Sequence, residues 1–155
     1  MLADFNLNLF VAKWYCSKVW PEDLPQFAAD ALDAGFDGTA LRRLAGLIMP
    51  TSHDVGDLFE RALREIGPLK IQSREQALVF FSRSIALDIV EGRITPQRGA
   101  ETLASCAGVN EYPPFLEEFV QLADMFYWDE HATSSQKLAQ EIIAEAQQLL
   151  ASLPA

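Results

Sequence analysis

The sequence is poor in histidine and cysteine. Two residues of each kind occur among its 155: His53, His131, Cys16 and Cys106. The cysteines are isolated, with no CxxC spacing and no histidine nearby, which favours buried, inert thiols in a reduced setting over a disulfide framework or a redox role. Neither histidine has a second histidine three or four residues away, the spacing of a helical metal site. The sequence therefore predicts neither a bound metal nor a cofactor.

Catalytic motifs are also lacking. The chain has no GxSxG, HExxH, GxxxxGK[ST] or GxGxxG pattern, so no catalytic residue is predicted. Asp88 and Glu91 share one helical face, as a glycosidase or hydratase would use. The same two carboxylates are also typical of a hydrogen-bonded polar seam capped by Arg83 or Arg93. Enzymatic function is therefore the alternative hypothesis and not the first.

No uninterrupted apolar run approaches the ~18 residues of a membrane helix. The first residues, MLADFNLNLFVAKWYCSK, lack the basic start of a signal peptide, and polar residues interrupt their apolar positions. We therefore expect a cytoplasmic protein that is neither exported nor inserted in a membrane.

Basic residues are almost missing from the last third of the chain. The net charge is −10, and residues 99–155 hold Lys137 against nine acids. A surface of this charge repels nucleic acid and anionic lipid and attracts a cationic partner. The other interpretation is a solvated face that keeps an acidic protein soluble.

What the sequence has throughout is helical periodicity, with almost no strand signal. Glycines at 35, 67, 92 and 108 are predicted helix stops, Ser52 a cap, and Thr95-Pro96 a helix start. Gly99 is expected to let two helices approach closely. We predict an all-α fold, a single domain over residues 1–155, built as an irregular bundle of about eight helices. The expected helices lie within residues 5–20, 23–34, 37–50, 53–66, 74–91, 96–108, 114–131 and 133–153.

Two segments carry a resemblance. The combination of WPEDLPQFAADALDAGFDGTALRRLAGL with IALDIVEGRITPQRGAETL is similar to small all-helical, largely uncharacterised bacterial proteins, in which an ALRRLAGL segment precedes an IVxGRIxPxxGA turn. The likeness covers about two thirds of the chain and brings no catalytic motif with it. It implies an accessory or immunity-type protein.

The segment ADMFYWDEHATSSQ, residues 123–136, places aromatic residues directly before acids. Tyr127 and Trp128 fall at the flank of the expected helix, beside Asp124, Asp129 and Glu130. Aromatic anchors with a charged rim are typical of an interface hot spot. The alternative is that both rings pack beneath the last helix. The predicted partner-binding residues are Glu117, Glu118, Asp124, Tyr127, Trp128, Asp129 and Glu130.

Two functional hypotheses follow. The first is a non-catalytic cytosolic protein-binding module, an acidic immunity or inhibitor-type protein that occludes a basic partner such as a toxin. The second is a helical metal- or small-molecule-binding enzyme that uses Asp88, Glu91 and the histidines, His53 and His131. Self-association as a homodimer through the apolar first helix is compatible with either hypothesis.

Overall fold

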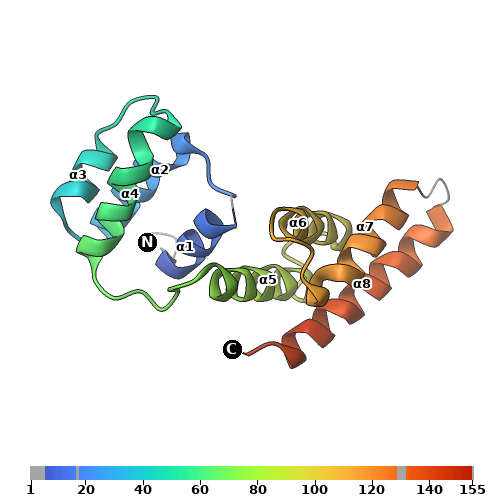
Figure 1. Ribbon diagram of the computed structural model, residues 1–155. Helices are drawn as coiled ribbons and strands as arrows, with labels where there is room; N and C mark the ends of the chain where they lie inside the picture. Colours follow the sequence, from blue (N-terminus) through green and yellow to red (C-terminus); the bar gives the residue numbers. More distant parts are fainter. Residues whose placement is uncertain (1–5, 17, 129–131, 155) are drawn as a thin grey trace. The chain divides into compact units, whose positions relative to one another are not determined.

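A computed structural model describes residues 6–16, 18–128 and 132–154 of the chain. Within these residues there are eight α-helices, two short 3₁₀ helices and no strand, so the predicted all-α helical bundle is confirmed (Figure 1). By its contacts the chain divides into two compact units, unit 1 over residues 1–74 and unit 2 over residues 75–155. A single domain over residues 1–155 stays a prediction, because density of contacts does not say whether two units unfold together.

The described residues of unit 1 form four α-helices and one 3₁₀ helix: α1 (Leu7–Tyr15), η1 (Pro21–Asp23), α2 (Leu24–Asp33), α3 (Thr39–Ala45) and α4 (Ser52–Ile66). Aromatic rings from three helices form part of its core. Phe10 of α1 stacks on Phe27 of α2 at a centroid distance of 4.0 Å. Phe59 of α4 meets Phe27 edge-on at 5.5 Å and lies 4.4 Å from Trp14. Offset and edge-on contacts of this kind stabilise a core beyond the area that they bury.

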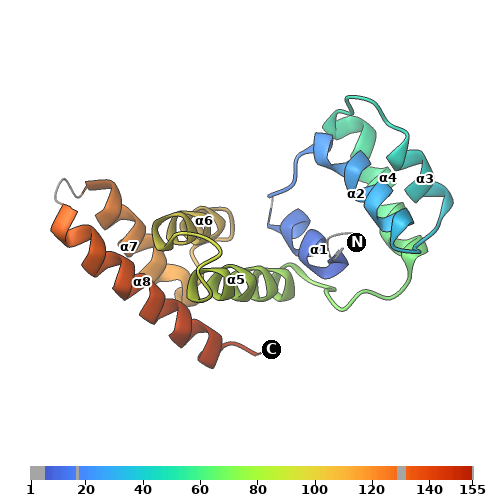
Figure 2. The ribbon, with the colours of Figure 1, turned by 180° about the vertical axis from the view of Figure 1, so that it is seen from behind.

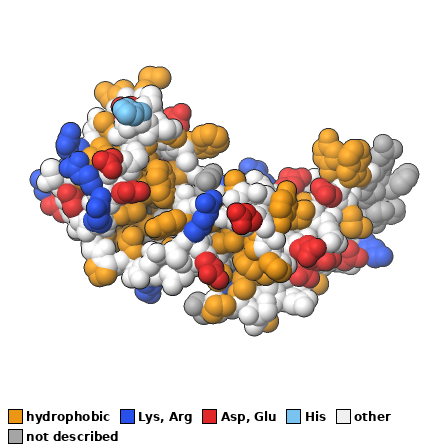
Figure 3. Space-filling view, viewed as in Figure 1, with side chains coloured by type: hydrophobic (Ala, Val, Ile, Leu, Met, Phe, Trp, Pro, Cys, Tyr) orange, Lys and Arg blue, Asp and Glu red, His pale blue; other side chains and the backbone are white. Residues whose placement is uncertain are grey.

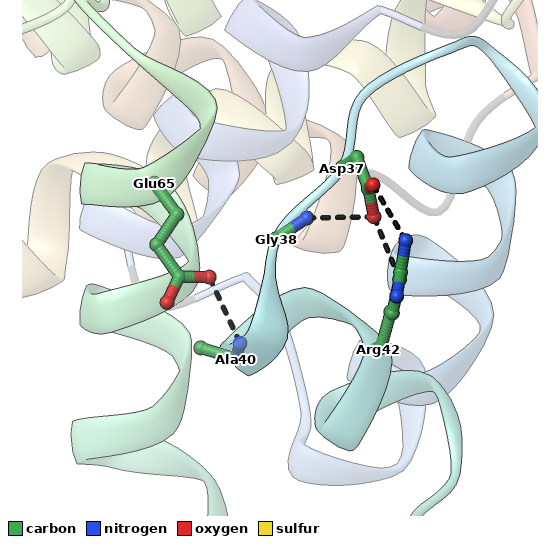
Figure 4. A network of polar contacts seen from close by, with 5 residues as sticks. All are labelled: Asp37, Gly38, Ala40, Arg42 and Glu65. Carbon is green, nitrogen blue, oxygen red and sulfur yellow. Dashed lines mark hydrogen bonds and ion pairs between the residues drawn. The ribbon is translucent and has the colours of Figure 1, made fainter.

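A side chain of α4 caps the first turn of α3 (Figure 4). The Glu65 carboxylate accepts a hydrogen bond of 2.8 Å from the backbone N–H of Ala40, one of the donors that the first turn of a helix leaves unsatisfied. Gly38 makes room for this contact, because a Cβ at that position would lie 2.4 Å from Glu65 Oε2. On the other side, Asp37 accepts hydrogen bonds from the Gly38 N–H and the Arg42 guanidinium.

The ends of α4 differ in one respect from the sequence-based expectation. Its N-cap is Thr51, one residue before the predicted cap Ser52, and the Asp54 carboxylate accepts a hydrogen bond from the Thr51 N–H. Hydrogen bonds from the backbone N–H and from the hydroxyl of Thr51 lower the pKa of the Asp54 carboxyl. Gly67 ends the helix as predicted, with a φ of 115°.

Unit 2 contains α5 (Arg74–Val90), α6 (Pro96–Val109), η2 (Pro114–Leu116), α7 (Glu117–Trp128) and α8 (Ala132–Ser152). Helices α7 and α8 lie side by side and antiparallel, as both views show (Figures 1 and 2). Gly92 takes a left-handed φ of 74° and Thr95 caps α6, as predicted. The stop predicted at Gly108 is wrong: α6 continues to Val109, and the chain turns through left-handed Glu111 and Tyr112.

Close helix packing holds unit 2 together. A Cβ on Gly99 would lie 2.4 Å from the Ile89 side chain, so the predicted close approach of α5 and α6 is confirmed. Arg83 of α5 donates from Nη1 to the carbonyls of Leu150 and Leu153 at 2.9 and 2.8 Å. The guanidinium therefore satisfies the end of α8, where helix carbonyls have no partner of their own. The larger buried side chains of this unit include Leu103, Leu116, Phe119 and Ile142.

Candidate functional site

Helix α7 separates a buried side from an outward side. Phe119, Leu122 and Ala123 are buried in the core of unit 2. Glu117, Asp124 and Trp128 occur at intervals of seven and four residues, so the helical period places them on one stripe directed away from that core. All three are exposed. Two acids of α7 and the tryptophan at its end thus share one exposed face.

The end of α7 exposes three large apolar side chains, Met125, Tyr127 and Trp128, which we call the aromatic end. Their exposed fractions are 52%, 79% and 77%. The rings of Tyr127 and Trp128 meet edge-on at a centroid distance of 5.0 Å. The alternative that both rings pack beneath the last helix is therefore wrong. Figure 3 shows a hydrophobic patch at this end of unit 2, with Asp and Glu side chains along the neighbouring helices.

The predicted acidic residues lie in two places on α7. Glu117 and Glu118 form the first turn, where carboxylates complement the positive end of the helix dipole. Asp124 lies one helical turn before Trp128, so it borders the aromatic end. Asp129 and Glu130, the other two predicted partner-binding residues, lie outside the described residues.

A further acid, Glu145 of α8, lies near Glu118 of α7, and the sequence-based prediction missed it. Burial and the nearby Glu118 carboxylate raise the pKa of Glu145 above its usual value. Two carboxylates from adjacent helices therefore repel each other here, and a cation placed between them would relieve that repulsion. In the sequence, Glu145 lies beside the apolar stripe of the last helix, which indicates partial burial. The stripe does not indicate which helix packs against it, so the pairing with Glu118 was not predictable.

Asp88 and Glu91, the two carboxylates of the enzymatic hypothesis, both form ion pairs with Arg93. Arg93 Nε lies 2.6 Å from the Asp88 carboxylate, and the same guanidinium pairs with Glu91. This arrangement agrees with the second interpretation of Asp88 and Glu91, a hydrogen-bonded polar seam capped by Arg93. Arg83, the other proposed cap, instead binds the end of α8.

Of the two histidines, one lies among the described residues. His53 is exposed in the first turn of α4, next to Asp54, whose carboxylate is engaged by Thr51. His131 lies outside the described residues, as do its neighbours Asp129 and Glu130. Among the described residues, no group of three His, Cys, Asp or Glu side chains is placed to hold a metal ion.

The basic pair Arg42-Arg43 is partly neutralised, because Arg42 forms a two-pronged ion pair with Asp37. In the part of the chain that the structure describes, every helix is too short or too polar to cross a bilayer.

Comparison with known proteins adds no relative. No protein-family model matches the chain, and searches of curated proteins and of solved structures return no match.

Proposed function

We propose that the chain is a non-catalytic, cytosolic protein-binding module of the inhibitor or immunity type, and that unit 2 docks a basic partner protein. The observation that carries this proposal is the exposed pair of rings at the aromatic end. Burial of two such rings contributes strongly to association, and Trp and Tyr are enriched among the residues that dominate binding energy. Neither ring contributes to the core of its own unit.

The charge of unit 2 supports the choice of partner. Residues 75–155 hold four Lys/Arg against twelve Asp/Glu, a net charge of −8. Among the described residues, Glu117, Glu118 and Asp124 make no ion pair with a basic side chain. A partner with a positive rim around an apolar pocket would gain attraction from these carboxylates and from Asp129 and Glu130. The same charge opposes pairing of two copies through this face, and it opposes nucleic acid and anionic membranes.

The decisive experiment is affinity capture of the tagged chain from an extract of its native host, washed with increasing salt and analysed by mass spectrometry. We expect one basic protein that is retained at low salt and released as salt rises, because salt screens charge pairs at an interface. A toxin would be a partner of this chemistry. The association rate of the captured protein is then measured with purified components.

Variants make the test specific. Trp128→Ala is expected to weaken binding by at least ~30-fold, as for an interface hot spot of about 2 kcal/mol. The matched control is Trp20→Ala, which removes an equally exposed tryptophan (72%) from unit 1. Glu117→Lys with Asp124→Lys should slow association, whereas Asp33→Lys with Asp57→Lys, which changes the net charge equally in unit 1, should slow it less. Equal effects of the two charge reversals, or full binding by Trp128→Ala, would show that the partner docks elsewhere.

The enzymatic alternative, with Asp88, Glu91 and the histidines, has less support because Arg93 engages both carboxylates. A thermal-shift screen against divalent ions tests its metal-dependent form, since a ligand that binds the folded chain raises the melting temperature.

A further inference from the structure

Unit 1 has an open hollow with a volume of about 450 Å³. Three segments line it: residues 6–8 at the start of α1, Phe36 between α2 and α3, and residues 68–70 between α4 and α5. The volume falls within the range of small-molecule sites. The hollow belongs to unit 1 and shares no residue with the aromatic end.

The described side chains that line the hollow carry a positive charge, whereas the chain as a whole is negative. Its described lining residues include one charged side chain, Lys70, and no Asp or Glu. Lys70 is exposed and makes no ion pair with a described carboxylate. The chain as a whole has a net charge of −10. An anion bound in this hollow would contact the Lys70 ammonium, and the described lining holds no carboxylate to repel it.

The first turn of α1 adds hydrogen-bond donors to the same wall. Asn6 is the N-cap, and its side chain accepts from the Leu9 N–H at 3.0 Å. The N–H groups of Leu7 and Asn8, at the first two helical positions, have no acceptor within an α-helix. No acid lies in this turn, so the positive end of the dipole is not offset locally.

Apolar side chains form the rest of the wall. Leu7, Phe36 and Leu69 are half-buried. The position of Phe36 is fixed by the left-handed turn at Gly35 and by the hydrogen bond from the Phe36 N–H to the Ala31 carbonyl, 3.0 Å long. A ligand that fits all three properties has one anionic group and a compact apolar body.

We propose that this hollow binds a small apolar carboxylate of the arylalkanoate class. The carboxylate lies between the Lys70 ammonium and the first-turn N–H groups of α1, and the apolar body contacts Phe36 and Leu69. This site is independent of the docking function proposed for unit 2, and either one can fail alone.

The test uses the full chain, labelled with ¹⁵N, and 3-phenylpropanoate as the probe. Titration should shift the amide signals of residues 6–9, 36 and 69–70 and saturate. The neutral analogue 3-phenylpropan-1-ol should bind about fivefold more weakly, because it lacks the charge that Lys70 and the helix dipole attract. No saturable shift, shifts that centre on other residues, or equal affinities for the acid and the alcohol would each overturn the proposal.

Two variants separate a local contact from the general field of the protein. Lys70→Gln should remove most of the difference in affinity between 3-phenylpropanoate and the alcohol, because only the α1 dipole then favours the acid, and it should leave the affinity for the alcohol unchanged. Arg61→Gln removes the same charge from an exposed position on α4 and should change neither affinity. Far-UV circular dichroism confirms that both variants are folded. If the two variants weaken binding equally, Lys70 does not contact the carboxylate, and the site as proposed is wrong.

Discussion

Replacing Arg83 with alanine should destabilise unit 2 by removing the groups that satisfy the end of α8. In the native chain, Arg83 Nη1 lies 2.9 Å from the Leu150 carbonyl and 2.8 Å from the Leu153 carbonyl. Hydrogen bonds that involve a charged group contribute about 1.5–3 kcal/mol each when they are buried. Arg83 is half-buried, so water can replace part of each bond. We therefore expect a total loss of about 2 kcal/mol in the free energy of unfolding.

Urea denaturation followed by circular dichroism measures this loss as a lower midpoint at constant m-value. For a chain of this size, the loss corresponds to a melting temperature about 4–8 °C lower. Arg83→Lys keeps the charge, but the lysine side chain is one bond shorter, so its ammonium does not reach the Nη1 position between the two carbonyls, and we expect about half the loss. Arg98→Ala is the matched control, because it removes an exposed arginine from α6 and should change stability by less than about 0.5 kcal/mol.

The reasoning would be refuted if Arg83→Ala were as stable as Arg98→Ala. A loss for Arg83→Ala with unchanged hydrogen exchange in the last turn of α8 would also contradict it, because the contacts that are removed lie in that turn.

Three further predictions concern unit 2. Gly99→Ala should lower the unfolding free energy by about 1–3 kcal/mol, seen in urea midpoints, because a Cβ there would overlap Ile89. Ser82→Ala should be neutral or stabilising by up to about 1 kcal/mol in the same assay, since the buried Ser82 hydroxyl has no hydrogen-bond partner among the described residues. The raised pKa of Glu145 means that the folded state holds this proton more tightly than the unfolded state, so wild type should lose stability relative to Glu145→Gln as pH rises from 4.5 through the raised pKa. Urea midpoints from pH 4 to 8 measure the difference, and Glu118→Gln should make it smaller; parallel pH profiles for all three chains would contradict this assignment.

The helices were predictable because their signals are local. Gly92, Thr95 and Gly99 act through backbone conformation or close approach, and each does so as the sequence indicated. The errors are also local. Adjacent Thr51 and Ser52 are equivalent as capping residue types, and the carboxylate of Asp54 decides between them by pairing with Thr51.

Contacts between distant segments could not be predicted in this way. The bond from Ala40 to Glu65 spans 25 residues, and those from Arg83 to the end of α8 span 67 and 70. Helical periodicity tells which face of each helix is apolar, but it does not tell which helix covers that face. Lys70 was missed for the same reason, because the hollow that it lines is formed by segments that are distant from it in the sequence.

The predicted docking residues do not support the function equally. Glu117 and Glu118 have a structural explanation, since acids in the first turn stabilise α7 whether or not a partner exists. Asp124 is in the middle of the helix and gains nothing from the dipole. Tyr127 and Trp128 bury little surface in their own unit, so folding does not account for two large rings at adjacent positions. The aromatic end and Asp124 therefore carry the argument for a partner, and Trp128→Ala, which should leave stability unchanged, is the variant in which a loss of binding can be assigned to the interface alone.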